Sequence, residues 1–341
     1  MSVVETVKTL IVCDIGGSNA RFGLRSTDKN TQEAKITNII KYYRDDFSSF
    51  NEVLERYHYD VSKKFDVKDW PISVAIAGSR INSESWGFAQ DQWAFARDKR
   101  IVSVISDLNG FALGTATQAT HITLRDTKPK RDKGFQETII AVGTGLGLSY
   151  LRDGLAQETH GGHMRAFGVT TEQNTIIGII ERLSDRSHMS VYEDLASGSG
   201  LVRLYQAVCL YNGHPVLFVT PEDIIEKAEP RILEQSLRLF HEFLGLFAHM
   251  ALVYGHGFKG LYLGGGVLDV LVAHGLFDQD VFTRFLNQEA QESVAYNLEN
   301  CPIYLITEPY IALYGAAAAG DKALALIDAK RAKTEKSEKT L

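Results

Sequence analysis

The sequence predicts an α/β protein of two domains, in which each domain contains a glycine-tipped β-hairpin. Short apolar runs alternate with amphipathic helical patterns along the chain. With 341 residues, the chain is long enough for two domains that each bury a core. Segments 10–24 and 137–151 both combine a strand pattern, a glycine-rich turn and a second strand-like run. Two such hairpins predict two phosphate-binding turns that face a shared ligand.

The composition is that of an ordinary globular protein and argues against several classes of function. Hydrophobic residues make up 45% of the chain and charged residues 23%. The net charge of −6 leaves no basic footprint, so we expect no nucleic-acid partner. No apolar run approaches the roughly 18–20 residues that span a bilayer, so no membrane association is expected. The three cysteines are widely spaced, which indicates reduced thiols in a cytoplasmic protein.

The first hairpin combines a carboxylate with a turn of small residues. The run Leu10–Cys13 predicts a strand buried on both faces, and Asp14 closes it. Glycines let backbone N–H groups approach an anion, and Asp14 can hold a hydrated Mg²⁺ ion. The alternative is a tight hairpin without a ligand. The predicted phosphate-binding turn consists of Gly16, Gly17, Ser18 and Asn19.

Asp107 is the candidate catalytic residue of the first half. Strands are predicted over 36–43, 72–77 and 101–106, and a helix begins at about Phe50. Asp107 follows the last of these strands and precedes another helix. Ligands of open α/β sheets bind at the carboxyl ends of strands, so Asp107 can be a general base. It can equally be a helix N-cap, and the two roles are compatible.

The second half contains the other glycine turns. Segment 121–136 is basic and predicts a solvated linker. His160 and His163 follow the second hairpin, but without cysteines or an HExxH frame a metal site there is disfavoured. Helices are predicted over 171–183, after Ser197 and over 230–254, the last being central and buried. The turn residues of the second hairpin are Gly143, Thr144 and Gly145.

Two further glycine strings lie near the end of the chain. Segment 255–260 matches GxGxxG but follows a helix, which predicts a helix-ending loop and not a dinucleotide site. Gly264, Gly265 and Gly266 follow a strand and precede a helix over 267–274, so an adenine ring can lie against their backbone. The alternative is a tight β–α turn. A strand over 302–306 and a small-residue helix from 309 that packs on a neighbouring helix complete the pattern.

The motifs together resemble the bacterial-type glucokinase family of the hexokinase–actin superfamily. The resemblance covers about residues 8–320. Six motifs carry it in the family's order: DIGGSNAR (14–21), SDLNGFALG (106–114), VGTGLGLSYL (142–151), HGGH (160–163), EDLASGSGLVRLY (193–205) and LGGGVL (263–268).

The resemblance implies an α/β fold of two ribonuclease-H-like lobes of the actin/hexokinase type around a central cleft. Residues 1–110 with 310–330 would form the small lobe and 111–309 the large lobe, with a disordered tail over 331–341. The implied activity is ATP-dependent phosphorylation of the 6-hydroxyl of glucose with Mg²⁺. Family members are commonly homodimers, so a homodimer is expected.

The resemblance also implies roles for individual residues. Asp107 matches the family's catalytic aspartate, and His163 and Glu193 match two sugar contacts. ATP phosphates would lie between turns 16–18 and 143–145, with adenosine near 264–266. There is no GxxxxGK[ST] loop and no protein-kinase signature.

Three positions depart from the family pattern. Ser106 stands where the family usually has Asn, His160 where it has Glu, and Ala89–Gln90 where it has Thr–Asn. Ser106 and His160 are predicted sugar contacts, so a kinase for another hexose or amino sugar stays an alternative. A sensor that binds sugar or nucleotide with little turnover is a second alternative. The glycine strings alone leave a nicotinamide-dependent oxidoreductase as a third.

Overall fold

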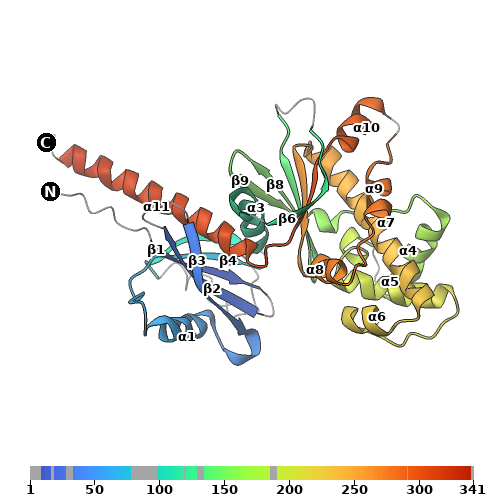
Figure 1. Cartoon of the computed structure of the whole chain (residues 1–341), viewed down its shortest axis with the longest axis horizontal. Coiled ribbons are helices and arrows are strands. Elements are labelled where there is room, and N and C mark those ends of the chain that lie inside the picture. Colours follow the sequence, from blue (N-terminus) through green and yellow to red (C-terminus); the bar gives the residue numbers. More distant parts are fainter. Residues whose placement is uncertain are drawn as a thin grey trace. The chain divides into compact units, whose positions relative to one another are not determined.

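The computed structural model describes residues 9–16, 19–27, 34–77, 98–118, 120–128, 134–184, 190–289 and 291–338. The chain divides into two compact units, each with its own β-sheet (Figure 1). The first unit comprises Met1–Ala119 with Glu308–Leu341, and the second Thr120–Thr307. The helices within the described ranges are all too short or too polar to cross a membrane.

The first unit is a five-stranded sheet in the order β3-β2-β1-β4-β5. Strand β1 is antiparallel to β2 and parallel to β4, and β4 is parallel to β5. The elements of this unit are β1 (Thr9–Ile15), β2 (Asn19–Thr27), β3 (Ala34–Tyr43), the 3₁₀-helix η1 (Arg44–Asp46), α1 (Phe50–Val61), β4 (Ile72–Ile76), β5 (Ile101–Ser106), α3 (Asp107–Gln118) and α11 (Ile311–Glu338).

Strand β1 lies at the centre of this sheet and is buried on both faces. Ile11 and Cys13 pack with α1, whereas Leu10 and Val12 pack with α11, as the period-two alternation of strand side chains requires. Figure 1 shows α1 and α11 on opposite faces of the sheet. This double burial explains why the strand reads as a continuous apolar run.

Helices α3 and α11 pack so closely that glycine is required at their contact. A Cβ on Gly315 would lie 1.7 Å from the carbonyl oxygen of Gly110, and one on Gly114 would lie 2.2 Å from that of Ile311. The predicted close packing of the small-residue helix is therefore confirmed. The structure continues α11 to Glu338, which differs from the disordered tail predicted from residue 331.

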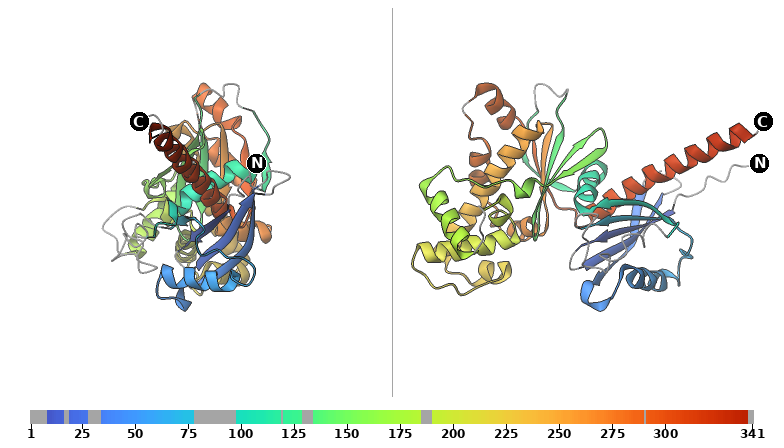
Figure 2. Two further views of the ribbon diagram at one scale, coloured as in Figure 1. Left: turned by 90° about the vertical axis from the view of Figure 1, so that its left-hand side faces the viewer. Right: turned by 180° about the vertical axis from the view of Figure 1, so that it is seen from behind.

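The second unit is a six-stranded sheet in the order β6-β11-β10-β7-β8-β9. Its helices gather on one face of the sheet (Figure 2). The elements are β6 (His121–Arg125), β7 (Glu137–Val142), β8 (Leu146–Arg152), β9 (Leu155–Thr159), η3 (Gly161–His163), α4 (Thr171–Leu183), η4 (Tyr192–Asp194), α5 (Gly198–Tyr211), α6 (Pro221–Lys227), α7 (Pro230–Gly255), β10 (Gly260–Gly264), α8 (Gly266–Ala273), α9 (Gln279–Leu286), α10 (Glu292–Glu299) and β11 (Ile303–Ile306).

The two sheets share one strand order, which agrees with the expectation of two ribonuclease-H-like lobes. Strands β9-β8-β7-β10-β11 repeat the order β3-β2-β1-β4-β5, with an antiparallel meander followed by two parallel strands. Strand β6 is an additional antiparallel edge strand. The two glycine hairpins, β1–β2 and β7–β8, therefore occupy equivalent places in the two units.

Helix α7 is the central helix of the second core, as its all-round apolar pattern predicts. It begins with Pro230 at its first turn, where the missing N–H is not needed. It ends at Gly255, and His256 caps it in the left-handed conformation with φ of 52°. Strand β10 then begins at Gly260. The prediction of a helix-ending loop over 255–260 is confirmed.

Two predicted boundaries differ from the structure. The predicted linker over 121–136 is wrong at its beginning, because His121–Arg125 form β6 and the Arg125 guanidinium donates to the carbonyl of Leu298 at 2.6 Å. Residues 129–133 lie outside the described ranges. The predicted division after residue 110 falls inside α3, whereas the compact units divide after Ala119 and after Thr307.

Candidate functional site

Three parallel strands of the first unit end together, next to the predicted catalytic residue. The register pairs Ile15 with Ile76 and Ile76 with Ser106, so β1, β4 and β5 terminate at one edge. Gly16 and Asp107 are the next residues after β1 and β5. The first hairpin turn and the candidate base therefore share the carboxyl edge of one sheet, where ligands of open α/β sheets bind.

The turn of the first hairpin is closed by backbone contacts. Gly16 N–H donates to the carbonyl of Asn19 at 2.8 Å, and a Cβ on Gly16 would lie only 3.2 Å from that oxygen. Asn19 begins β2. The other two predicted residues of the turn, Gly17 and Ser18, lie outside the described ranges.

Asp14 lies one residue before the end of β1 and is 8% exposed. It pairs across the hairpin with Arg21, whose Nη1 lies 2.9 Å from Asp14 Oδ2. Burial raises the pKa of Asp14, and the nearby Arg21 charge opposes that shift without cancelling it. Carboxylate oxygen is the ligand type that Mg²⁺ prefers. Within the described ranges, no three His, Cys, Asp or Glu side chains form a cluster that could hold a metal ion.

Ser106 and Asp107 form the junction between β5 and α3. Ser106 Oγ accepts the N–H of Asn109 at 3.1 Å, which is the bond that an N-cap side chain makes. Asp107 Oδ1 accepts the N–H of Leu108 at 2.8 Å. The cap is therefore supplied by Ser106, which is 5% exposed. The alternative interpretation of Asp107 as the N-cap is not what the hydrogen bonds show.

The turn of the second hairpin lies against the beginning of α5. Gly143 N–H donates to the carbonyl of Gly145 at 3.0 Å, and Gly198 N–H donates to the carbonyl of Gly143 at 2.8 Å. Ser197 caps α5 by accepting the N–H of Gly200. The amino end of a helix carries a partial positive charge and favours anions. Thr144, at the tip of the turn, is exposed.

The third glycine turn lies beside the second hairpin. Strand β10 is parallel to β7, and Gly264 pairs with Ala141, two residues before Gly143. Gly265 has φ of 109°, and a Cβ there would lie 2.6 Å from the carbonyl oxygen of Val142. Both observations require glycine. Gly266 begins α8 and faces open space. The predicted adenosine-binding turn is therefore adjacent to the predicted phosphate-binding turn.

The predicted sugar contacts of the second unit meet the same hairpin. His160 and His163 flank two buried glycines and are both exposed, with ring centres 6.3 Å apart. A Cβ on Gly162 would lie 2.0 Å from the carbonyl oxygen of Leu146, so this turn packs directly on β8. Glu193 Oε2 accepts the N–H of Leu146 at 2.9 Å. Leu146 thus joins both segments to the glycine turn.

Comparison with known proteins gives the family. The family model described as Glucokinase matches residues 11–323. The chain belongs to the Glucokinase family. A glucokinase of Saccharophagus degradans is 29% identical over 324 residues, which are 90% of this chain and 97% of that protein. A glucokinase of Chromobacterium violaceum is 30% identical over 322 residues, 89% of this chain and 87% of that protein.

Solved structures of glucokinases share the fold. The crystal structure of a glucokinase from an Antarctic psychrotroph superposes with a TM-score of 0.74 at 23% identity, over 92% of this chain and 99% of that chain. A ROK family glucokinase from Streptomyces griseus, in complex with glucose and AMPPNP, superposes with a TM-score of 0.55 at 16% identity. The match covers 91% of this chain and 98% of that chain. The predicted α/β fold of the hexokinase type and the predicted glucokinase family are thus confirmed.

Three residues of the site were not found from the sequence. Arg21 follows from the hairpin register, since it lies opposite Asp14, and a register argument would have found it. Leu146 acts through its backbone N–H, which has no signature in the sequence. Tyr192, beside Glu193, is fully buried against Phe247 and looks like any other core aromatic residue.

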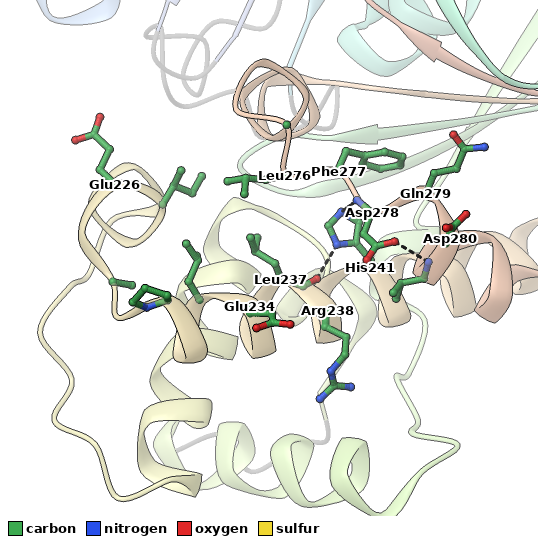
Figure 3. A pocket seen from close by; sticks show the side chains of 16 residues that line it. Glu226, Glu234, Leu237, Arg238, His241, Leu276, Phe277, Asp278, Gln279 and Asp280 are labelled. Carbon is green, nitrogen blue, oxygen red and sulfur yellow. Dashed lines mark hydrogen bonds between the residues drawn. The ribbon is translucent and has the colours of Figure 1, made fainter.

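A cavity of about 810 Å³ in the second unit contains none of the predicted site residues (Figure 3). It lies between α6, α7 and the segment that leads into α9. Several polar groups on its wall already serve the fold: His241 bonds to the Leu237 carbonyl and to the Asp278 N–H, and Asp278 caps α9 through Val281. Arg238 pairs with Glu172 and Glu242. We therefore assign the candidate site to the glycine turns and not to this cavity.

Proposed function

We propose that the chain phosphorylates the 6-hydroxyl of glucose with ATP. The observation that carries this proposal is the place of Asp107, which follows β5 at the sheet edge that also holds the turn of the first glycine hairpin. The membership of the chain in the Glucokinase family supports it. Of the residues that directly follow the parallel strands β1, β4 and β5, which are Gly16, Ala77 and Asp107, only Asp107 is an acid.

In this mechanism the Asp107 carboxylate accepts the proton of the sugar hydroxyl while the hydroxyl oxygen attacks the γ-phosphorus of ATP. The bond from phosphorus to the β–γ bridging oxygen breaks, and ADP leaves. The Leu108 N–H orients the carboxylate through Oδ1, and the Ser106 cap fixes the start of α3. Phosphoryl transfer needs positioning and charge stabilisation more than covalent chemistry, which suits one base and several backbone turns.

The glycine turns leave room for the phosphates of ATP beside the backbone, and the amino end of α5 favours their negative charge. The proposed contacts to these phosphates are Gly16 and Asn19 in the first unit and Gly143, Thr144 and Gly145 in the second. Gly264, Gly265 and Gly266 receive the adenosine. Asp14 would hold Mg²⁺ through water, because carboxylate oxygen is a ligand type that Mg²⁺ prefers. When bound, Mg²⁺ neutralises charge that develops on the phosphates.

His160, His163, Glu193 and Ser106 are the proposed sugar contacts. Ser106 and His160 differ from the residues usual in the family, and the Ser106 hydroxyl already accepts the Asn109 N–H. This observation favours a second candidate function, a kinase for another hexose or an amino sugar. We also propose a homodimer, on the resemblance, and a cytoplasmic location, which the three free buried cysteines support.

The experiment is an assay of ADP release from MgATP with a panel of hexoses and amino sugars. Release with glucose supports the first function, and release with another sugar alone supports the second. Nucleotide binding without release on any sugar contradicts both and supports a sensor.

The role of Asp107 is tested separately. We expect Asp107→Asn to abolish turnover and to leave ATP binding intact. Asp66→Asn removes the same charge from an exposed position of the same unit and serves as the matched control. Turnover of Asp107→Asn at the parent rate would show that another group is the base.

A further inference from the structure

The carboxylate of Glu193 occupies the space that a side chain at residue 145 would need. An ideal Cβ on Gly145 would lie 2.6 Å from Glu193 Oε2 and 3.3 Å from Cδ. Gly145 is not among the glycines at positive φ, so its backbone does not itself require glycine. Gly143, two residues away in the same turn, has no atom within 4 Å of an ideal Cβ. A side chain would therefore meet another group at residue 145 but not at residue 143.

Glu193 cannot move away as a unit, because its backbone is fixed on both sides. Tyr192 N–H donates to the carbonyl of Met164 at 3.0 Å, and the Tyr192 ring is fully buried. Ser197 Oγ donates to the carbonyl of Glu193 at 2.7 Å. A methyl group at residue 145 would therefore be accommodated by rotation of the Glu193 side chain. That rotation breaks the hydrogen bond from the Leu146 N–H to Oε2.

We propose that Gly145 is a positioning residue for the acceptor sugar, which acts through Glu193. The Leu146 N–H holds Oε2, and the absent side chain at 145 leaves room for that arrangement, so the carboxylate presents a fixed orientation to a sugar hydroxyl. This inference rests on the proposed function. It moves Gly145 from the predicted nucleotide contacts to the sugar side of the site and leaves Gly143 on the nucleotide side.

The test compares Gly145→Ala with Gly143→Ala, the same substitution in the same turn. KM for glucose, KM for ATP and kcat are measured for both variants and the parent enzyme. We expect Gly145→Ala to raise KM for the sugar about tenfold or more, since it displaces a charged hydrogen-bonding group, with a change in KM for ATP below about threefold. Gly143→Ala is expected to change KM for ATP more than KM for glucose. Equal patterns in the two variants would overturn the proposal.

A double-mutant cycle with Glu193→Asp distinguishes this contact from a general structural effect. The shorter side chain withdraws the carboxylate from residue 145, so Gly145→Ala should cost less than about threefold in kcat/KM in that background. A cost equal to that in the parent background contradicts the proposal. If Gly145→Ala alone does not fold, recovery of folding in the double variant supports the contact, and failure to recover contradicts it. A parent enzyme that phosphorylates no hexose refutes the proposed function instead, which is a separate result.

Discussion

Ser106 offers a test that separates the stability of the fold from the recognition of the sugar. Its side chain is 5% exposed and caps α3 by accepting the Asn109 N–H. Ser106→Ala removes the cap and should lower the free energy of unfolding by about 1 kcal/mol, within a range of roughly 0.5–2 kcal/mol. Asparagine is as good an N-cap as serine. We therefore expect Ser106→Asn to change the free energy of unfolding by less than about 0.5 kcal/mol.

Ser106→Asn should also change catalysis, because asparagine is the usual family residue at a predicted sugar contact. One additional neutral hydrogen bond is worth about 0.5–1.5 kcal/mol, so kcat/KM for glucose should rise by about 2- to 12-fold. Urea unfolding and an ADP-release assay measure the two effects on the same preparations. A lower kcat/KM for glucose in Ser106→Asn, or a loss of stability as large as that of Ser106→Ala, would refute this reasoning.

Three further predictions concern the second unit. Gly178 lies inside α4 with open space around an ideal Cβ. Gly178→Ala should therefore raise the free energy of unfolding, measured with urea, by about 0.5–1 kcal/mol. A decrease would contradict the open space at this position. The Tyr192 hydroxyl is buried and has no hydrogen-bond partner among the described residues. Tyr192→Phe should therefore leave the free energy of unfolding unchanged or raise it by up to about 1 kcal/mol. A clear decrease would indicate that the hydroxyl has a partner. Burial lowers the pKa of His241 from 6.5 to about 4, so between these pH values the His241 ring stays neutral in the folded protein and takes up a proton in the unfolded chain. His241 should therefore lower stability by up to about 1.4 kcal/mol per pH unit as the pH falls from 6.5 towards 4, and His241→Gln should abolish that share of the pH dependence.

Segments with one dominant signal were predictable from sequence. Three examples are the apolar run of β1, the capped helix α4 and the buried helix α7. The local sequence pattern of each determines its secondary structure, and the predicted positions agree with the structure within a few residues. That agreement arises because β-strand ends and tight turns are encoded by neighbours in sequence.

The remaining features depend on contacts between distant segments. Nothing local in 121–125 indicates that this basic segment pairs with β11, because edge strands are short and polar. The cap of α3 could be Ser106 or Asp107 by composition, and only the observed bond from Asn109 decides it. Gly145 and Glu193 are 48 positions apart in the sequence, and Leu146, whose N–H bonds to Glu193, is 47 positions from it. Such contacts leave no periodic signal.

The place of α11 in the first unit has a consequence for synthesis on the ribosome. Its residues Leu313 and Ala316 cover Leu10 and Val12 of β1, so one face of the first sheet lacks part of its cover until the last helix has been translated. The whole of Thr120–Thr307 emerges before that helix. We therefore expect the second unit to reach its native packing first during translation, and the first unit to complete its packing only after α11 has been translated.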